Sequence, residues 1–108
     1  MKGEKVLYIY ALEDRLKIGI TTNLCNRVTQ LHYKYPKPIL IYMSESFTDA
    51  SYEKERLVHE KLSSYRLNGE WFSVKPDIAI NIIQEICGIH GHITNRNHVF
   101  FDYNIVWI

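Results

Sequence analysis

Two neighbouring segments bring tyrosine hydroxyls close to a lysine, an arrangement that could create a proton acceptor. Tyr8, Tyr10, Lys17 and Gly19 all lie within "KVLYIYALEDRLKIGI". If a two-residue turn joins two strands here, Tyr10 faces Lys17 and Tyr8 faces Gly19. A free tyrosine has a pKa of about 10, and an ammonium opposite it would lower that pKa toward neutrality. The alternative is that both tyrosines pack on the sheet while Lys17 extends into water.

A second group of residues could bind an anion and a metal ion. Arg27 lies beside the apolar stripe of a predicted helix, where its guanidinium could reach a phosphate or a carboxylate. Glu55 and His59 are one helical turn apart at the edge of another stripe, where the carboxylate could hold a metal ion. Ordinary salt bridges would explain Arg27 and Glu55 equally well, so these residues alone leave both interpretations open.

A third group suggests a different class of protein. The segment "CGIHGHITNRNH" contains one thiol and three imidazoles, from Cys87, His90, His92 and His98. Thiolates and imidazoles are the usual ligands of structural zinc. The C-x2-H-x-H spacing is not one of the common zinc-binding frames, however, and Cys87 is expected on the buried side of a helix. A zinc-binding interaction domain is therefore kept as an alternative.

The elements that must position these residues form a mixed α/β pattern. Alternating apolar residues predict a β-hairpin over residues 6–20 and a third strand over "ILIYMSESF". Helices are expected over residues 24–34, 49–65 and 76–87, capped by Asn23, by Thr48 or Asp49, and by Gly88. The predicted fold class is α/β (α+β), with a small three-stranded, mainly antiparallel sheet flanked by helices. The order is β-β-α-β-α, then "EWFSV" as a short strand or turn, a C-terminal helix and a tail.

Length and composition favour a single globular domain. The chain has 108 residues, of which 46% are hydrophobic, enough to bury one core. No apolar run could span a bilayer, no signal-peptide cleavage site follows the start, and two cysteines do not make a disulfide framework. We therefore expect an intracellular protein with no membrane partner. Residues 1–38 hold seven basic and three acidic side chains, which predicts either an anion-binding face or a solvated surface.

Taken together, these motifs resemble the GIY-YIG nuclease superfamily, most closely its T5orf172/Mug113-like branch. "YIY" and "KIG" stand where the family has its GIY and YIG elements, and "TTNLCNR" ends in the family arginine. "EKERLVHEKL" resembles the E-x-x-x-H helix of the branch, and "NGEWF" resembles its closing motif. The likeness covers residues 6–74. It implies a nuclease core over residues 1–74, with residues 75–108 as a C-terminal helix and strand-like extension of the same domain.

The resemblance also implies a chemistry. It is the hydrolysis of DNA phosphodiester bonds with one divalent cation, Mg²⁺ or Mn²⁺. Tyr10 would be the general base or its helper, and Glu55 would hold the metal ion. Arg27 and Lys17 would stabilise the phosphate. Supporting positions are Tyr8, Gly19 and His59, and the residues expected to contact DNA are Lys17, Arg27 and Lys34.

Three departures from the family pattern keep a second function open. Lys17 replaces the second tyrosine of the pattern, and Tyr8 stands in place of the GIY glycine. No residue of the sequence is identified as the late asparagine of the family. The alternative is a catalytically degenerate module that binds DNA or a protein partner by the same face. In either case a homodimer or a partner domain would supply specificity, because a chain this short has little else with which to read bases.

The segment "GEWFSV" is expected to be structural. Trp71 and Phe72 are large apolar side chains that would close the core over the helix carrying Glu55. Glu70 would then lie at the rim of the core. The sequence therefore predicts a packing role for this segment rather than a catalytic one.

Overall fold

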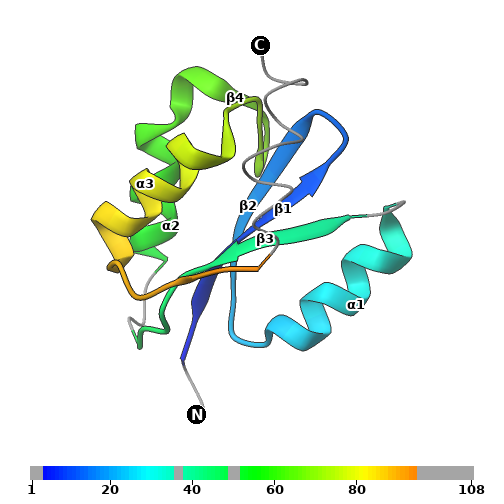
Figure 1. The fold of residues 1–108 in the computed structure, drawn as a ribbon, viewed down its shortest axis with the longest axis horizontal. Helices are drawn as coiled ribbons and strands as arrows, with labels where there is room; N and C mark the ends of the chain where they lie inside the picture. The colour runs from blue at the N-terminus through cyan, green and yellow to red at the C-terminus, as the bar shows by residue number, and fades with distance from the viewer. Residues whose placement is uncertain (1–3, 36–37, 49–51, 95–108) are drawn as a thin grey trace.

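The computed structural model describes residues 4–35, 38–48 and 52–94, which form one antiparallel sheet with helices on both faces (Figure 1). The elements in chain order are β1 (Val6–Leu12), β2 (Arg15–Thr21), α1 (Leu24–Lys34), β3 (Ile39–Met43), α2 (Glu53–Lys61), a 3-10 turn (Ser63–Tyr65), β4 (Arg66–Asn68), β5 (Trp71–Phe72), α3 (Pro76–Cys87) and β6 (His92–Ile93). The predicted mixed α/β class is confirmed.

The predicted three-stranded sheet and its element order are wrong. The sheet has six strands in the order β4-β5-β2-β1-β3-β6. The predicted strands β1, β2 and β3 form its centre, and the additional strands extend both edges. Each additional strand has only two or three residues. Such short segments cannot establish an alternating hydrophobic pattern, which is the main sequence signal for a strand.

The hairpin of β1 and β2 has the predicted register. Tyr10 pairs with Lys17, and Tyr8 pairs with Gly19. Glu13 has a φ of 56°, a left-handed conformation that tight hairpin turns use. Because directly paired residues share one face of a sheet, the side chains of Tyr8, Tyr10 and Lys17 point to the same side, the side on which Gly19 leaves space.

The sheet separates two apolar layers of unequal size. Helices α2 and α3 cover one face, and α1 covers the other (Figure 1). The larger core lies beneath α2 and α3 and includes Ile9, Ile18, Val58, Phe72 and Ile83. The smaller core lies beneath α1 and is formed by Tyr8, Tyr10 and Leu31. The tyrosines of the hairpin are therefore core residues on the α1 side.

Helix boundaries agree with the sequence at two of three helices. The Asn23 side chain accepts a hydrogen bond from the Asn26 amide and caps α1, and α3 ends at Gly88 with a φ of 104°. The second helix is shorter than predicted at both ends, because it begins only at Glu53, after Tyr52 as N-cap, and its last predicted residues form the 3-10 turn. Thr48 lies in non-helical backbone before it, and Asp49 lies outside the described residues.

The two aromatic residues of "GEWFSV" face opposite sides of the sheet. Phe72 is fully buried, with its ring centroid 5.0 Å from that of His59, so it closes the core beneath α2 as predicted. Trp71 instead packs edge-to-face on Tyr35, with the ring centroids 5.2 Å apart. The prediction that Trp71 also closes the core over α2 is wrong, because successive residues of a strand alternate between faces.

The tail "HVFFDYNIVWI", which includes His98, lies outside the described residues. Within the described ranges, no helix combines the length and apolar character needed to cross a membrane.

Candidate active site

Five side chains from five segments meet beside Gly19, and we call them the candidate site. They are Tyr8 of β1, Lys17 of β2, Arg27 of α1, Glu55 of α2 and Glu70 of the loop before β5. Three of the four predicted catalytic residues are in this group, and Tyr10 is the exception. Glu70, expected at the rim of the core, is an additional member.

Tyr8 and Arg27 are joined by a hydrogen bond. The Arg27 guanidinium donates from Nη1 to the Tyr8 hydroxyl at 3.2 Å. Tyr8 is fully buried, and this burial, together with the charge of Glu70, raises the pKa of Tyr8 to about 12 against the opposing effect of Arg27. The hydroxyl therefore stays protonated at neutral pH and can still donate its own hydrogen bond.

Tyr10 lies deeper, under α1. Its ring makes an edge-to-face contact with that of Tyr8, with the centroids 5.8 Å apart, and only 2% of Tyr10 is exposed. Burial raises the pKa of Tyr10. The predicted lowering of that pKa by Lys17 is wrong, because the ammonium turns toward Glu70. A role for Tyr10 as general base stays a prediction.

Glu55 and Glu70 bring two carboxylates into direct contact. Burial, and then the charge and contact of Glu70, raise the pKa of Glu55 to about 7, although Arg27 and Lys17 act to lower it. Oε2 of Glu55 and Oε1 of Glu70 are buried and accept no hydrogen bond from any described residue. The ammonium of Lys17 is 3.1 Å from Oε1 of Glu70 but outside hydrogen-bonding geometry, so the ion pair balances charge without satisfying the oxygen.

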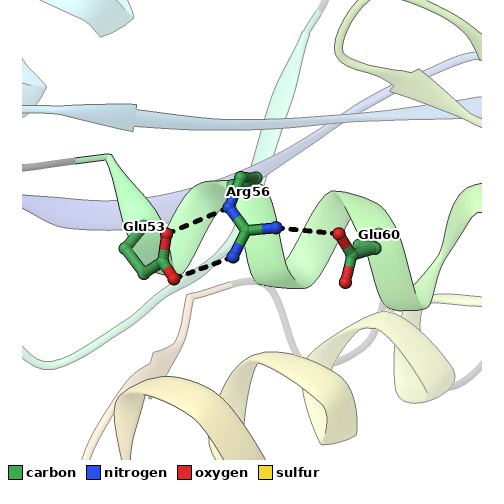
Figure 2. A network of polar contacts seen from close by, with 3 residues as sticks. All are labelled: Glu53, Arg56 and Glu60. Atoms are coloured by element: carbon green, nitrogen blue, oxygen red, sulfur yellow. Dashed lines mark hydrogen bonds and ion pairs between the residues drawn. The ribbon is translucent and has the colours of Figure 1, made fainter.

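Other glutamates of α2 have ordinary surface environments. Figure 2 shows Arg56 between Glu53 and Glu60, to which it forms ion pairs of 2.7 and 2.8 Å. All three side chains are at least half exposed. Glu60 therefore offers a matched control for Glu55, since it is a glutamate of the same helix with an ordinary charge partner.

Gly19 leaves the space in which the candidate site assembles. A Cβ atom there would lie 2.6 Å from the Tyr8 hydroxyl and 2.7 Å from Oε1 of Glu70. We expect Gly19→Ala to displace one of these groups, to destabilise the fold by about 1–3 kcal/mol and to weaken any function of the site. Thermal unfolding measures the first effect. A variant as stable as the wild type would contradict this packing.

His59 links α2 to the inner strand β2. Its Nε2 lies 2.8 Å from the Ile18 carbonyl oxygen. Burial lowers the pKa of His59, so the ring is neutral near pH 7. Because a carbonyl only accepts, Nε2 carries the proton and donates it. His59 thereby fixes α2, the helix that carries Glu55, against the strand. Its supporting role at the candidate site stays a prediction.

A basic pocket opens next to the candidate site. It has a volume of about 150 Å³ and is lined by Lys17, Arg27, Gln30, Leu31, Lys34 and Tyr35. Three of these residues are cationic and none is acidic. The three residues predicted to contact DNA, Lys17, Arg27 and Lys34, therefore share one pocket whose charge suits a phosphate group.

The donor atoms at the candidate site fit a hard divalent cation. Two carboxylates are the usual protein contribution to Mg²⁺ or Mn²⁺ sites, where water and substrate phosphate complete the shell. Oε2 of Glu55 and Oε1 of Glu70 have no hydrogen-bond donor among the described residues, and Lys17 would have to release its ion pair with Oε1 of Glu70 for that oxygen to act as a ligand. Across the described ranges, no cluster of three or more Cys, His, Asp or Glu residues could hold a metal ion by itself.

The zinc alternative receives no support from the described residues. Cys87 is buried, and burial raises the pKa of its thiol to about 11, which opposes the thiolate that zinc binding needs. The amide of His90 donates to Glu45 at 3.1 Å, and His92 belongs to β6. No metal-binding cluster forms around these residues in the described part of the chain.

Comparison with known proteins gives one match. The profile of the T5orf172 domain matches residues 5–87, a range that includes every member of the candidate site and extends through α3. Searches of curated proteins and of solved structures gave no match.

Proposed function

The chain belongs to the T5orf172 domain family, and from this premise we propose that it is a metal-dependent endonuclease that hydrolyses DNA phosphodiester bonds at the candidate site. The T5orf172 family is associated with nucleases, so the general class of the chain is that of a nuclease-like or DNA-binding module. The more specific proposal, cleavage by a metal-dependent endonuclease, rests on one observation. Around one buried tyrosine hydroxyl lie Arg27, Lys17 and two carboxylates.

The cationic side chains match the charge of the reaction. Attack of water on a phosphodiester builds negative charge on the phosphate oxygens, and fixed cations lower the energy of that state. Arg27 and Lys17 both line the basic pocket and belong to the candidate site. In our proposal they bind the scissile phosphate, and Lys34 binds a neighbouring phosphate.

The tyrosine of the hairpin has a positioning role in this proposal. The Tyr8 hydroxyl is held by Arg27, whereas Tyr10 packs beneath α1. We therefore assign to Tyr8 the orientation of the attacking water through a hydrogen bond. Its high pKa means that it does not take the proton, so a carboxylate of the site is the better acceptor.

Glu55 would hold the divalent cation. When bound, such a cation polarises the phosphate and lowers the pKa of water. The chain's own contribution is a half-buried carboxylate with an oxygen that has no hydrogen-bond donor among the described residues, on a helix that His59 anchors to β2.

A second candidate function is DNA binding without cleavage. It is favoured by the two hairpin tyrosines, because burial raises the pKa of both and neither is prepared to act as a base. The basic pocket would serve such a module unchanged. Supercoiled plasmid incubated with the protein and Mg²⁺ or Mn²⁺ separates the two functions. The nuclease proposal expects nicks that EDTA prevents, and the binding-only function expects a gel shift without nicks.

We expect Lys34→Ala to weaken DNA binding to a similar extent for all sequences. Lys34 lines the basic pocket without belonging to the candidate site, so its removal deletes one phosphate contact. The slope of log K against log salt should fall by about one unit. Fluorescence anisotropy with labelled duplexes at several salt concentrations measures this slope. Lys61→Ala is the matched control, because Lys61 pairs with Glu85 at 3.5 Å on α3. An unchanged slope for Lys34→Ala would exclude a phosphate contact.

A further inference from the structure

We infer that Glu70 is a second cation ligand, which shares one divalent metal ion with Glu55, and that the Lys17 ammonium balances its charge until the cation binds. The inference rests on the proposed function and adds a residue to it. It also gives a role to a glutamate whose sequence context indicates only packing.

Two neighbouring carboxylates without hydrogen-bond donors favour a shared cation. Glu55 and Glu70 are in direct contact, an arrangement of like charges that is unfavourable unless a cation or a proton lies between them. One buried oxygen of each, Oε2 of Glu55 and Oε1 of Glu70, has no hydrogen-bond donor among the described residues. Buried acceptors in folded proteins are normally satisfied. A shared cation would satisfy both oxygens at once.

The backbone of Glu70 is anchored to strand β2. Its backbone carbonyl accepts a hydrogen bond from the Ile18 amide at 2.9 Å, and the next residue, Trp71, pairs with Lys17 across β2 and β5. The same strand β2 provides the carbonyl that fixes His59 on α2. The backbone of Glu70 and the helix that carries Glu55 are thus both hydrogen-bonded to Ile18 of β2, which limits how far the two carboxylates can move apart.

Lys17 has two neighbours that can hold its ammonium, the Glu70 carboxylate and the Trp71 ring. Its ammonium is 3.1 Å from Oε1 of Glu70 and 5.3 Å from the centroid of the Trp71 ring. The Trp71 ring can hold the Lys17 ammonium by a cation–π contact once the Glu70 carboxylate binds the cation instead. Lys17 also lines the basic pocket. A cation bound to Glu70 would therefore leave Lys17 available to a phosphate.

The chemistry of the pair selects the class of cation. Both ligands are carboxylates, and in the described part of the chain no third His, Cys, Asp or Glu completes a metal site with them. Hard oxygen ligands with several water positions suit Mg²⁺ and Mn²⁺, whereas zinc prefers nitrogen and sulfur.

Mn²⁺ binding measured by electron paramagnetic resonance tests the inference without any reference to catalysis. Free Mn²⁺ gives a signal that is lost on binding, so a titration yields the number of sites and their affinity. We expect one site in the wild type and a loss of about tenfold or more in affinity for Glu70→Gln. Glu60→Gln is the matched control and should bind as the wild type does. Circular dichroism verifies that each variant is folded.

A second variant, Lys17→Met, tests the inference even if Glu70→Gln fails to fold. Lys17→Met removes the ammonium that competes with the cation, so Mn²⁺ affinity should rise if Glu70 is a ligand. Unchanged affinity in both Glu70→Gln and Lys17→Met would overturn the inference and leave Glu70 as a residue that positions Lys17. Absence of Mn²⁺ binding to the wild type in the millimolar range would overturn it as well.

The outcomes for the inference and for the proposed function are distinguishable. Mn²⁺ binding that depends on Glu70, in a protein that never nicks plasmid, would support the cation site and reject the nuclease. Nicking by the wild type, with Mn²⁺ affinity unaffected by Glu70→Gln, would support the nuclease and reject the second ligand.

Discussion

Glu55→Gln is expected to abolish DNA nicking and, in the absence of metal, to raise the melting temperature of the protein. Glutamine keeps the shape of the side chain but removes the charge that would hold the cation, so nicking should fall by at least about a hundredfold. The same change removes a half-buried charge that burial and Glu70 both disfavour. After solvent screening the gain is about 1 kcal/mol, or about 4–8 °C.

The stability effect has a defined pH dependence. The folded pKa of Glu55 is about 7 against an ordinary value of 4.5, so the folded protein binds more protons than the unfolded chain between these values. Stability contributed by Glu55 therefore falls as pH rises through this window. His59 acts in the opposite direction because its pKa is lowered, so the effect is read as the difference between Glu55→Gln and the wild type. That difference should grow with pH and vanish below the ordinary glutamate pKa.

The control for this experiment is the exposed glutamate of the same helix. Glu60→Gln loses only a surface ion pair with Arg56 (Figure 2) and should change neither nicking nor the pH profile. Plasmid nicking and calorimetry measure the two effects. Nicking by Glu55→Gln at the wild-type rate would contradict the proposed role of Glu55, and a lower melting temperature at pH 8 would contradict its strained environment.

Arg27→Ala should reduce DNA nicking about as strongly as Glu55→Gln, because it removes a positive charge that would bind the phosphate. Arg27 supplies a fixed positive charge at the basic pocket and the hydrogen bond to the Tyr8 hydroxyl. Loss of one such group from a phosphoryl site costs about 10²–10³-fold in rate. The buried hydroxyl also loses its donor, which destabilises the fold by about 1–3 kcal/mol. Nicking rates and thermal unfolding measure these two losses.

A double variant separates the two consequences of losing Arg27. Arg27→Ala combined with Tyr8→Phe removes the unsatisfied hydroxyl together with its donor, so stability should recover while nicking does not. Arg56→Ala is the surface control, because Arg56 forms ion pairs with the exposed glutamates Glu53 and Glu60 of α2. If the double variant regained nicking, the function of Arg27 would be structural.

The parts of the site that could be predicted from the sequence depend on local periodicity. Alternation along β1 and β2 determined the register that pairs Tyr10 with Lys17 and Tyr8 with Gly19. The helical stripe of α1 placed Arg27 at its edge, next to the hairpin. These are short-range patterns, so the spacing of residues in the chain carries the information.

Glu70 and the choice between the two tyrosines could not be predicted in the same way. Strand β5 has two residues and no pattern of its own, yet its pairing with β2 carries Glu70 to the Ile18 amide. The pairing of Trp71 with Lys17 was the missing signal, since it brings the preceding residue beside Gly19. Which hairpin tyrosine reaches Arg27 depends on how α1 sits across the sheet, and this is a tertiary property.

The small hairpin of β4 and β5 makes part of the site a local folding unit. It joins the rest of the sheet through two residue pairs with β2, and β4 is exposed along its whole length. Phe72 anchors β5 in the larger core, whereas the exposed β4 and the loop that carries Glu70 contribute no residue to it. Segments with few buried contacts open at a lower free energy than the whole domain, so opening of β4 and this loop would separate Glu70 from Lys17 while Phe72 stays in the core. Hydrogen exchange at the Ile18 amide, whose acceptor is the Glu70 carbonyl, would then report the integrity of the site, and mild heating would inactivate the protein before it unfolds.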